Sequence, residues 1–507
     1  MTSLFASPYP PYDPTDKSGF SYVTVAKRWP IIITGVIDQL YRDCHTFSLE
    51  SQKDRADQIT FDGKIEEGKV IIEKLGKLKY QMGRDHPLEP IPDDGEPGVE
   101  VYNRELDRLA GLNKNTWFTA PWLYADESYR LIRAHCSITT YWNTFDPFLS
   151  QKLSTFSQSG TSIRQIAASM YELESEKGAL DKEKLGILFR EMLQMCLWGN
   201  ATDLSLLTHM SATDIEHLQV VGKDAQVARQ QFILKDDQEQ LWRYLSFLEA
   251  GRVDFVLDNS GFELFTDLVF ADFLVTYTPY VATVYFHPKL IPWFVSDVTP
   301  PDFQHVFTSL LDPSFFPTPV GDTSTPPLEH ITRMVTRWEQ YVEQGIFNLS
   351  VPSDTPLGSH APAAEFWTSP WPYWSMEFHA PELFESLKKS DLVIFKVFFL
   401  LIHKSLTDRY SIRAISTTET VFRLVGDVRW PTWTPFEAAI GVLTRFFSFP
   451  LLSLRTNKAD VVVGVDKEVA EKLDSSSEEW RVNGRYALIS FLPRSKPVGL
   501  GRPHLGE

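Results

Sequence analysis

Oxygen-bearing side chains after two apolar runs in the middle of the chain could hold a metal ion. Asp258 and Asn259 directly follow a strand-like run at residues 253–257, and Asp297 follows a second run at residues 293–295. Functional groups gather beyond the carboxyl ends of strands in a parallel α/β sheet, so we expect both runs to deliver oxygens to one crevice. Two carboxylates and an amide oxygen suit Mg²⁺ or Mn²⁺. The sequence therefore predicts a divalent-metal site on an α/β sheet.

The residues around this pair leave two interpretations open. An Asp-Asn pair alone is more often a turn than a pair of ligands, and Ser260-Gly261 supplies a turn here. Glu263 and Asp267, one helical turn apart, could support the site from behind. Equally, they could be favourable charges at the start of a helix.

Two further segments carry candidate binding groups. A turn at Asn200 could expose Asn200 and Asp203 to the site, although Asp203 could equally cap the next helix. Arg455, Thr456 and Lys458 lie between two apolar runs, where two cations and a hydroxyl at a strand end would cradle a phosphate. The alternative for this second segment is a basic, solvated turn.

The elements that must position these residues change in kind along the chain. Helical periodicity predicts helices within residues 26–80, 102–112, 122–142, 162–174 and 181–198, with an exposed Pro-, Gly- and acid-rich loop at 85–100. Short apolar runs then predict strands at residues 255–259, 282–287, 293–297, 391–396, 451–458 and 459–465. Short buried strands separated by helices indicate an α/β/α sandwich with a mostly parallel central sheet, preceded by a mostly α-helical N-terminal region.

Composition limits the classes of partner. The chain has 507 residues and a net charge of −17, which argues against a nucleic-acid surface. It has no long apolar run and no basic-then-apolar start, so we expect no membrane span and no secretion signal. Three cysteines without a CxxC spacing indicate a reduced cytoplasmic or nuclear protein with no disulfide and no zinc site. We expect a monomer.

Five motifs together resemble the metal-dependent damage-control phosphatase family. They are LDNSGFELFTDLVFADFL, IPWFVSDVTPPDF, WGNATDLSLL, FWTSPWPYW and LRTNK, and the resemblance runs from about Ser21 to Phe491. The Arg-Thr-x-Lys motif is typical of the sugar-phosphate phosphatase branch, also called acidic-residue methyltransferase-like. The resemblance implies an α-helical N-terminal part on an α/β/α core. It also implies hydrolysis of fructose 1-phosphate and fructose 6-phosphate.

The resemblance also assigns roles to residues. It implies that Asp258, Asn259 and Asp297 bind Mn²⁺, Ni²⁺, Co²⁺ or Mg²⁺, that Lys458 contacts substrate, and that Glu263 is a further site residue. Arg455 and Asn200 complete the set predicted to bind substrate. A protein-carboxyl methyltransferase activity of the branch would place S-adenosylmethionine at the same residues. The usual glycine-rich nucleotide-binding signature is absent from the sequence, so this activity remains the alternative.

The chain departs from the family pattern after Lys396. The family motif Gly-Asp-Leu-Asn-Tyr-Arg, which helps bind substrate, is missing there. Residues 413–420 can be encoded as AGG GCG ATC TCA ACT ACC GAA ACN, and a shift of one base gives GGC GAT CTC AAC TAC CGA, which encodes the motif. We therefore expect residues 397–422 to be a translated intron plus an out-of-frame exon. A product of such a mis-spliced gene would lack one wall of the substrate pocket and be inactive.

The predicted organisation has four parts. Residues 1–20 form a flexible tail, 21–195 a helical N-terminal region, 196–495 the phosphatase core, and 496–507 a second tail.

Overall fold

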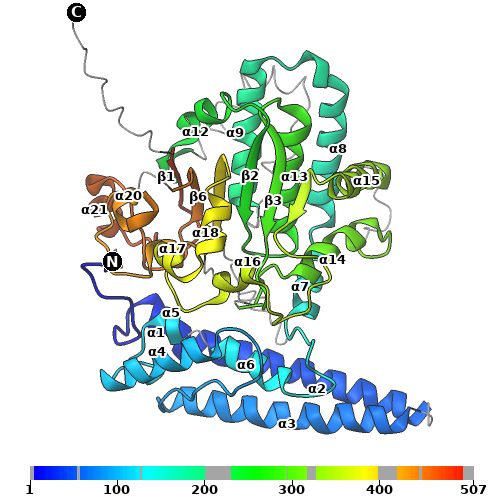
Figure 1. Cartoon of the computed structure of the whole chain (residues 1–507), viewed down its shortest axis with the longest axis vertical. Coiled ribbons are helices and arrows are strands. Elements are labelled where there is room, and N and C mark those ends of the chain that lie inside the picture. Colours follow the sequence, from blue (N-terminus) through cyan, green and yellow to red (C-terminus); the bar gives the residue numbers. More distant parts are fainter. Residues whose placement is uncertain are drawn as a thin grey trace, which may run out of the picture.

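The N-terminal part of the protein is helical. The computed structural model describes residues 5–53, 57–125, 128–199, 230–293, 295–316, 327–397, 420–444 and 448–494. The long helices α2 and α3 lie side by side beneath the rest of the molecule (Figure 1). The helices of this part are α1 (Phe20–Val23), η1 (Thr24–Arg28), α2 (Trp29–Lys53), α3 (Gln58–Gly83), α4 (Val99–Gly111), α5 (Trp122–Ala125), α6 (Ser128–Ser137), α7 (Leu149–Ser157), α8 (Gly160–Glu176), η2 (Lys177–Ala179) and α9 (Lys182–Trp198).

A seven-stranded sheet forms the centre of the second part, in the order β1-β7-β6-β5-β2-β3-β4. β6, β5, β2, β3 and β4 run parallel, β1 and β7 pair in parallel, and among the pairings of the described strands only β6–β7 is antiparallel. The strands are β1 (Ile233–Asp236), β2 (Gly251–Val256), β3 (Val281–His287), β4 (Phe347–Leu349), β5 (Leu392–Val397), β6 (Leu451–Thr456) and β7 (Ala487–Leu492). This confirms the predicted mostly parallel sheet.

Helices cover both faces of this sheet. The helices of this part are α12 (Gln238–Leu245), α13 (Phe262–Tyr277), α14 (Pro300–Leu311), α15 (Leu328–Glu343), α16 (Pro362–Glu365), η4 (Phe366–Thr368), η5 (Tyr373–Ser375), α17 (Met376–His379), α18 (Pro381–Leu387), α19 (Thr420–Val425), α20 (Phe436–Ala439), η6 (Gly441–Thr444) and α21 (Lys467–Asp474). Successive strand residues point to opposite faces. Phe255 accordingly joins a core with α9 and α13, whereas Val256 joins a second core with α18 and the N-terminal helices. The α/β/α architecture is therefore confirmed.

Two of the predicted strands are wrong. The chain from 293 to 297 forms no strand in its described residues, because Val295 adopts a left-handed φ of 47° that ends extended pairing. Trp293 is buried there by stacking on Tyr102 at a centroid distance of 5.3 Å. Residues 459–465 are irregular as well: their valines are buried, but Gly464 and Val465 donate backbone hydrogen bonds to a turn at residues 432–434 instead of to a strand. The short strands β1, β4 and β7 were not predicted.

Two segments predicted to be exposed or loose are packed. Within residues 85–100, the side chain of Asp94 is fully buried and that of Glu96 is 9% exposed, because arginines of α6 pair with both. Residues 5–19 of the predicted tail pack on the core, where the Tyr12 N–H donates to the Asp427 carbonyl over 2.9 Å. The predicted boundary at 195/196 falls inside α9, which contacts α13. Most of the segment 397–422 lies outside the described residues.

Candidate functional site

The loops that follow β2 and β3 come together at the carboxyl edge of the sheet. β2 ends at Val256, and Asp258 and Asn259 follow it directly. Asn259 forms an isolated antiparallel bridge with Asp297, and the Val298 N–H donates to the Asp258 carbonyl over 2.9 Å. The predicted residues are thus brought together, but by pairing between two loops and not by a second strand end.

A lysine joins the two carboxylates. The Nζ of Lys289 lies 2.5 Å from Oδ1 of Asp297 and 3.6 Å from Oδ1 of Asp258, and all three side chains are 1% exposed. Since both oxygens lie close to the same ammonium, the two acids share one small space. Sequence reasoning missed Lys289. Its position two residues beyond the end of β3 was the available signal.

The side chain of Asn259 holds the site together through both ends of its amide. Its Nδ2 donates to Oδ2 of Asp258 over 3.1 Å and to Oε2 of Glu263 over 2.9 Å. Its Oδ1 accepts a hydrogen bond from the hydroxyl of Ser296. Asn259 therefore fixes two carboxylates relative to each other.

A second layer of buried charge lies on α13 and β5. The Nζ of Lys396 donates to Oδ1 of Asp267 over 2.8 Å and to the carbonyl of Cys196 over 2.5 Å, and lies 3.7 Å from Oε1 of Glu263. Burial raises the pKa of Glu263 well above its usual range, with Lys396 opposing the rise and Asp258 adding to it. Burial alone would lower the pKa of Lys396, but the Asp267, Cys196 and Glu263 charges outweigh it and raise the value. Lys396 was not predicted as a site residue.

Lys458 is a nearly buried cation near Glu263. Burial lowers the pKa of Lys458 from 10.5 to about 7, while the Glu263 charge acts in the opposite direction. The side chain of Lys458 packs against Gly484, which has a φ of 72°; a Cβ at that glycine would lie 2.0 Å from Cε of Lys458. Position 484 therefore favours glycine for two reasons, its left-handed backbone and the lack of space for a Cβ beside Lys458.

The other residues of the Arg-Thr-x-Lys segment differ from Lys458. The Arg455 guanidinium donates to the carbonyl of Val461, and burial lowers its pKa to about 10. The Thr456 hydroxyl and the Asn457 amide are buried without a hydrogen-bond partner within the described residues. Asn200 and Asp203, the remaining candidates, lie outside the described residues.

The donor chemistry at this edge fits a divalent cation. Asp258 and Asp297 offer carboxylate oxygens, Asn259 offers an amide oxygen, and all three side chains are buried. Hard oxygens of this kind are ligands that Mg²⁺ and Mn²⁺ prefer. Within the described residues no cluster of three His, Cys, Asp or Glu side chains could hold a metal, so an ion here would need the asparagine. The assignment of ligands remains a prediction.

Comparison with known proteins gives a consistent family. A model described as the damage-control phosphatase ARMT1-like domain matches residues 24–396. Proteins named damage-control phosphatase ARMT1 from Mus musculus and Danio rerio are 33% and 31% identical to this chain over 489 and 488 residues. Each comparison covers 94% of this chain and 97% and 95% of the relative, respectively. A solved DUF89 family protein from Pyrococcus horikoshii matches with a TM-score of 0.34 and 14% identity, covering 78% of this chain and 90% of its own.

No helix among the described residues combines the length and the apolar character needed to cross a membrane.

Proposed function

Because this chain belongs to the damage-control phosphatase ARMT1-like family, we propose that it is a metal-dependent phosphatase of small phosphorylated sugars, such as fructose 1-phosphate and fructose 6-phosphate. The observation that carries the proposal is the meeting of Asp258, Asn259 and Asp297 at the carboxyl edge of the sheet. Glu263 and Lys458 lie beside them. Such edges are where parallel α/β sheets bind their ligands.

Asp258, Asn259 and Asp297 would hold the divalent ion, with Mn²⁺, Ni²⁺, Co²⁺ and Mg²⁺ as candidates. When bound, this ion supplies polarisation of the phosphoryl oxygens and activation of a water. Lys289 would shield the two carboxylates from bulk water and hold them in a fixed position relative to each other.

The other buried groups would act on the substrate directly. Lys458 would place a positive charge on the phosphoryl group, where charge accumulates during transfer. Glu263 has an Oε1 atom without a hydrogen-bond partner in the described structure, and burial favours its protonated form. The Oε1 of Glu263 would accept a hydrogen bond from a hydroxyl group of the sugar phosphate.

Replacing the central carboxylate tests this function. We expect Asp258→Asn to lower metal-dependent phosphate release from fructose 1-phosphate by about 100-fold or more, because a charged carboxylate ligand becomes a neutral amide. The assay measures inorganic phosphate with Mn²⁺, Ni²⁺, Co²⁺ or Mg²⁺, and again with a chelator. Asp107→Asn, an exposed change on α4, is the matched control and should leave the rate unchanged. Wild-type activity in Asp258→Asn would overturn the site assignment.

The segment after Lys396 affects the phosphatase activity that this assay should find. The family match ends at residue 396, directly before the segment expected to be an intron plus an out-of-frame exon. If that segment is translated, turnover should be low while metal binding persists, because catalysis depends on holding the phosphate in position. Calorimetric titration with Mn²⁺ therefore accompanies the phosphate assay. A methyl-transfer assay with S-adenosylmethionine tests the alternative activity.

A further inference from the structure

A cavity separate from the candidate site opens where the N-terminal helices meet the core. Its volume is about 410 Å³. Glu96 and Arg130 line it from the N-terminal side, and Leu290, Glu365 and Trp371 line it from the core. None of the residues predicted to bind metal or substrate is part of its lining. The volume lies in the range of small-molecule sites.

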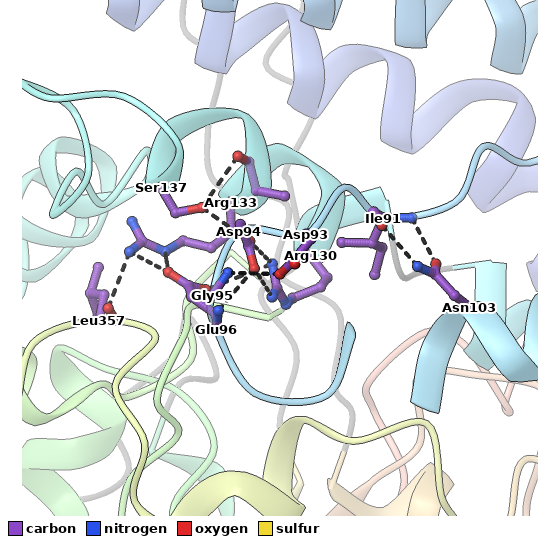
Figure 2. A network of polar contacts seen from close by, with 11 residues as sticks. Ile91, Asp93, Asp94, Gly95, Glu96, Asn103, Arg130, Arg133, Ser137 and Leu357 are labelled. Atoms are coloured by element: carbon purple, nitrogen blue, oxygen red, sulfur yellow. Dashed lines mark hydrogen bonds and ion pairs between the residues drawn. The ribbon is translucent and has the colours of Figure 1, made fainter. Parts of the chain in front are cut away.

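The positive charge at the base of the cavity is already neutralised. Arg130 donates two hydrogen bonds to Asp94, over 2.6 Å and 2.8 Å, in a bidentate pair (Figure 2). Arg133 donates from Nε to Oε1 of Glu96 over 2.9 Å and from a terminal nitrogen to the carbonyl of Leu357 over 3.1 Å. Each arginine is therefore paired with an acid, although Nη1 of Arg133 has no hydrogen-bond partner within the described residues.

Glu96 retains acceptor capacity. Its side chain is 9% exposed, yet its Oε2 has no hydrogen-bond partner within the described residues. Nη1 of Arg130 lies 3.7 Å from that oxygen, which is too far for a hydrogen bond, and Arg133 pairs with the other oxygen, Oε1, at 2.6 Å. Gly358, which also lines the cavity, packs directly against this carboxylate. A buried carboxylate oxygen without a donor is costly, and a donor from a ligand would relieve that cost.

The lining also includes two further acids, an aromatic pair and the hydroxyl groups of Ser359, Thr368 and Ser369. Glu365 and Glu382 are lining carboxylates, and Glu365 also contacts the exposed His360 at 3.0 Å. Trp371 stacks on His379 with a centroid distance of 4.1 Å and an interplanar angle of 7°. Burial lowers the pKa of His379, so the ring is neutral near pH 7. The lining thus combines unbalanced negative charge with a flat aromatic surface.

We propose that this cavity binds a small organic cation with a flat apolar body, of the arylalkylamine class. The ammonium would meet the carboxylates of Glu96, Glu365 and Glu382, and the flat body would lie among the apolar and aromatic walls. Aromatic faces and carboxylates together are a recurrent means of recognising organic cations. The proposal concerns binding alone and does not rest on the proposed phosphatase activity.

Calorimetric titration of the full chain with tryptamine tests the proposal, with indole-3-propionate as the probe that has the same ring and the opposite charge. We expect saturable binding of tryptamine at one site, and affinity for indole-3-propionate at least about 10-fold lower, since the cavity carries unmatched carboxylates. No saturable binding of tryptamine, or equal affinity for the two probes, would overturn the proposal.

Substitutions locate the binding. Glu365→Gln combined with Glu382→Gln should weaken tryptamine about 10-fold, whereas Glu437→Gln, an exposed acid on α20, should change nothing. Trp371→Leu should weaken both probes because it removes the aromatic wall, and it provides a second variant should the double substitution fold poorly. Unchanged tryptamine affinity in all of these variants would refute the assignment to this cavity.

Discussion

Two clusters of buried charge, one at the carboxyl edge of the sheet and one at the junction with the N-terminal helices, use different cations. The carboxylates of the sheet edge pair with Lys289 and Lys396, whereas those of the junction pair with Arg130 and Arg133. At the junction the planar guanidinium of Arg130 holds a carboxylate through two short bonds. At the sheet edge one ammonium is shared unequally between two acids, at 2.5 Å and 3.6 Å.

The difference lies in how firmly each kind of cation fixes its carboxylate. A guanidinium fork matches the geometry of a carboxylate and fixes it, whereas an ammonium is a point charge that can shift between partners. Both clusters retain buried polar atoms without partners within the described structure, at Glu263, Thr456 and Asn457 on the sheet edge and at Glu96 and Arg133 in the junction. We infer that the arginine pairs of the junction stabilise the fold, whereas the lysines of the sheet edge hold their acids less rigidly.

The largest expected effect is on stability at the junction. Arg130→Met would leave Asp94 buried and unpaired, so we expect a loss of about 3–5 kcal/mol in the free energy of unfolding. Arg108→Met breaks the pair with Glu105 on α4, where the arginine side chain is 58% exposed, and should cost less than about 1 kcal/mol. Urea unfolding monitored by circular dichroism measures both. Equal losses in the two variants would contradict a structural role for the junction.

A smaller effect is expected from the glycine that packs on the same cluster. Gly358 has a φ of 74°, and a Cβ there would lie 2.0 Å from the carboxylate of Glu96, so Gly358→Ala should cost about 2–3 kcal/mol. Gly345 has a similar φ of 69°, but its nearest neighbour would be Asn348 at 3.7 Å. Gly345→Ala should therefore cost only about 1 kcal/mol, the conformational part. Thermal unfolding of both variants measures the difference, and equal costs would show that Glu96 does not fix this contact.

The smallest expected effect on stability is at the sheet edge and concerns Lys458. The pKa of Lys458 is about 7 in the folded protein and 10.5 in the unfolded chain. Between these two pH values the side chain is therefore protonated in the unfolded chain and neutral in the folded protein. Burying the charge of Lys458 lowers the stability of the folded protein, and this cost is greatest at about pH 7 and below. The cost decreases, and stability therefore rises, as the pH increases across that window. Lys458→Met should raise the melting temperature by a few degrees, most at about pH 6 and less at about pH 9, while lowering phosphatase activity.

Melting curves at several pH values check this prediction. Lys472→Met, an exposed change at the end of α21, is the control and should show no such pH dependence. A melting temperature for Lys458→Met that falls, or rises equally at all pH values, would contradict the burial of a charge at this position.

The sequence allowed the sheet and the main acids of the candidate site to be predicted because both follow from local pattern. An apolar run followed by Asp258 and Asn259 marks the end of β2, and helical periodicity marks α9. The sequence left open whether Glu263 and Asp267 support the site or only favour the start of a helix. In the structure both side chains are fully buried, and Glu263 bonds to Asn259 while Asp267 bonds to Lys396, which favours the supporting role.

The rest depended on contacts between distant segments. Nothing local distinguishes Asp94 and Glu96 from solvated acids in a loop rich in proline and glycine, because their partners lie on α6, more than thirty residues away. A strand was predicted at Val295 because its apolar neighbours resemble a strand, and neither its left-handed backbone nor the bridge of Asp297 with Asn259 can be read from that local pattern. Lys289 and Lys396 join acids that come together only in the folded chain.

The position of the Asp94–Glu96 segment limits how this protein can be shortened. A version that begins after α3 and the following loop would keep Arg130 and Arg133 on α6 but remove both of their counter-charges. Two guanidinium groups would then be buried without acids, beside the loop that carries Leu357. Engineered truncations aimed at isolating the enzymatic half should therefore retain the chain from at least Ile91 onward.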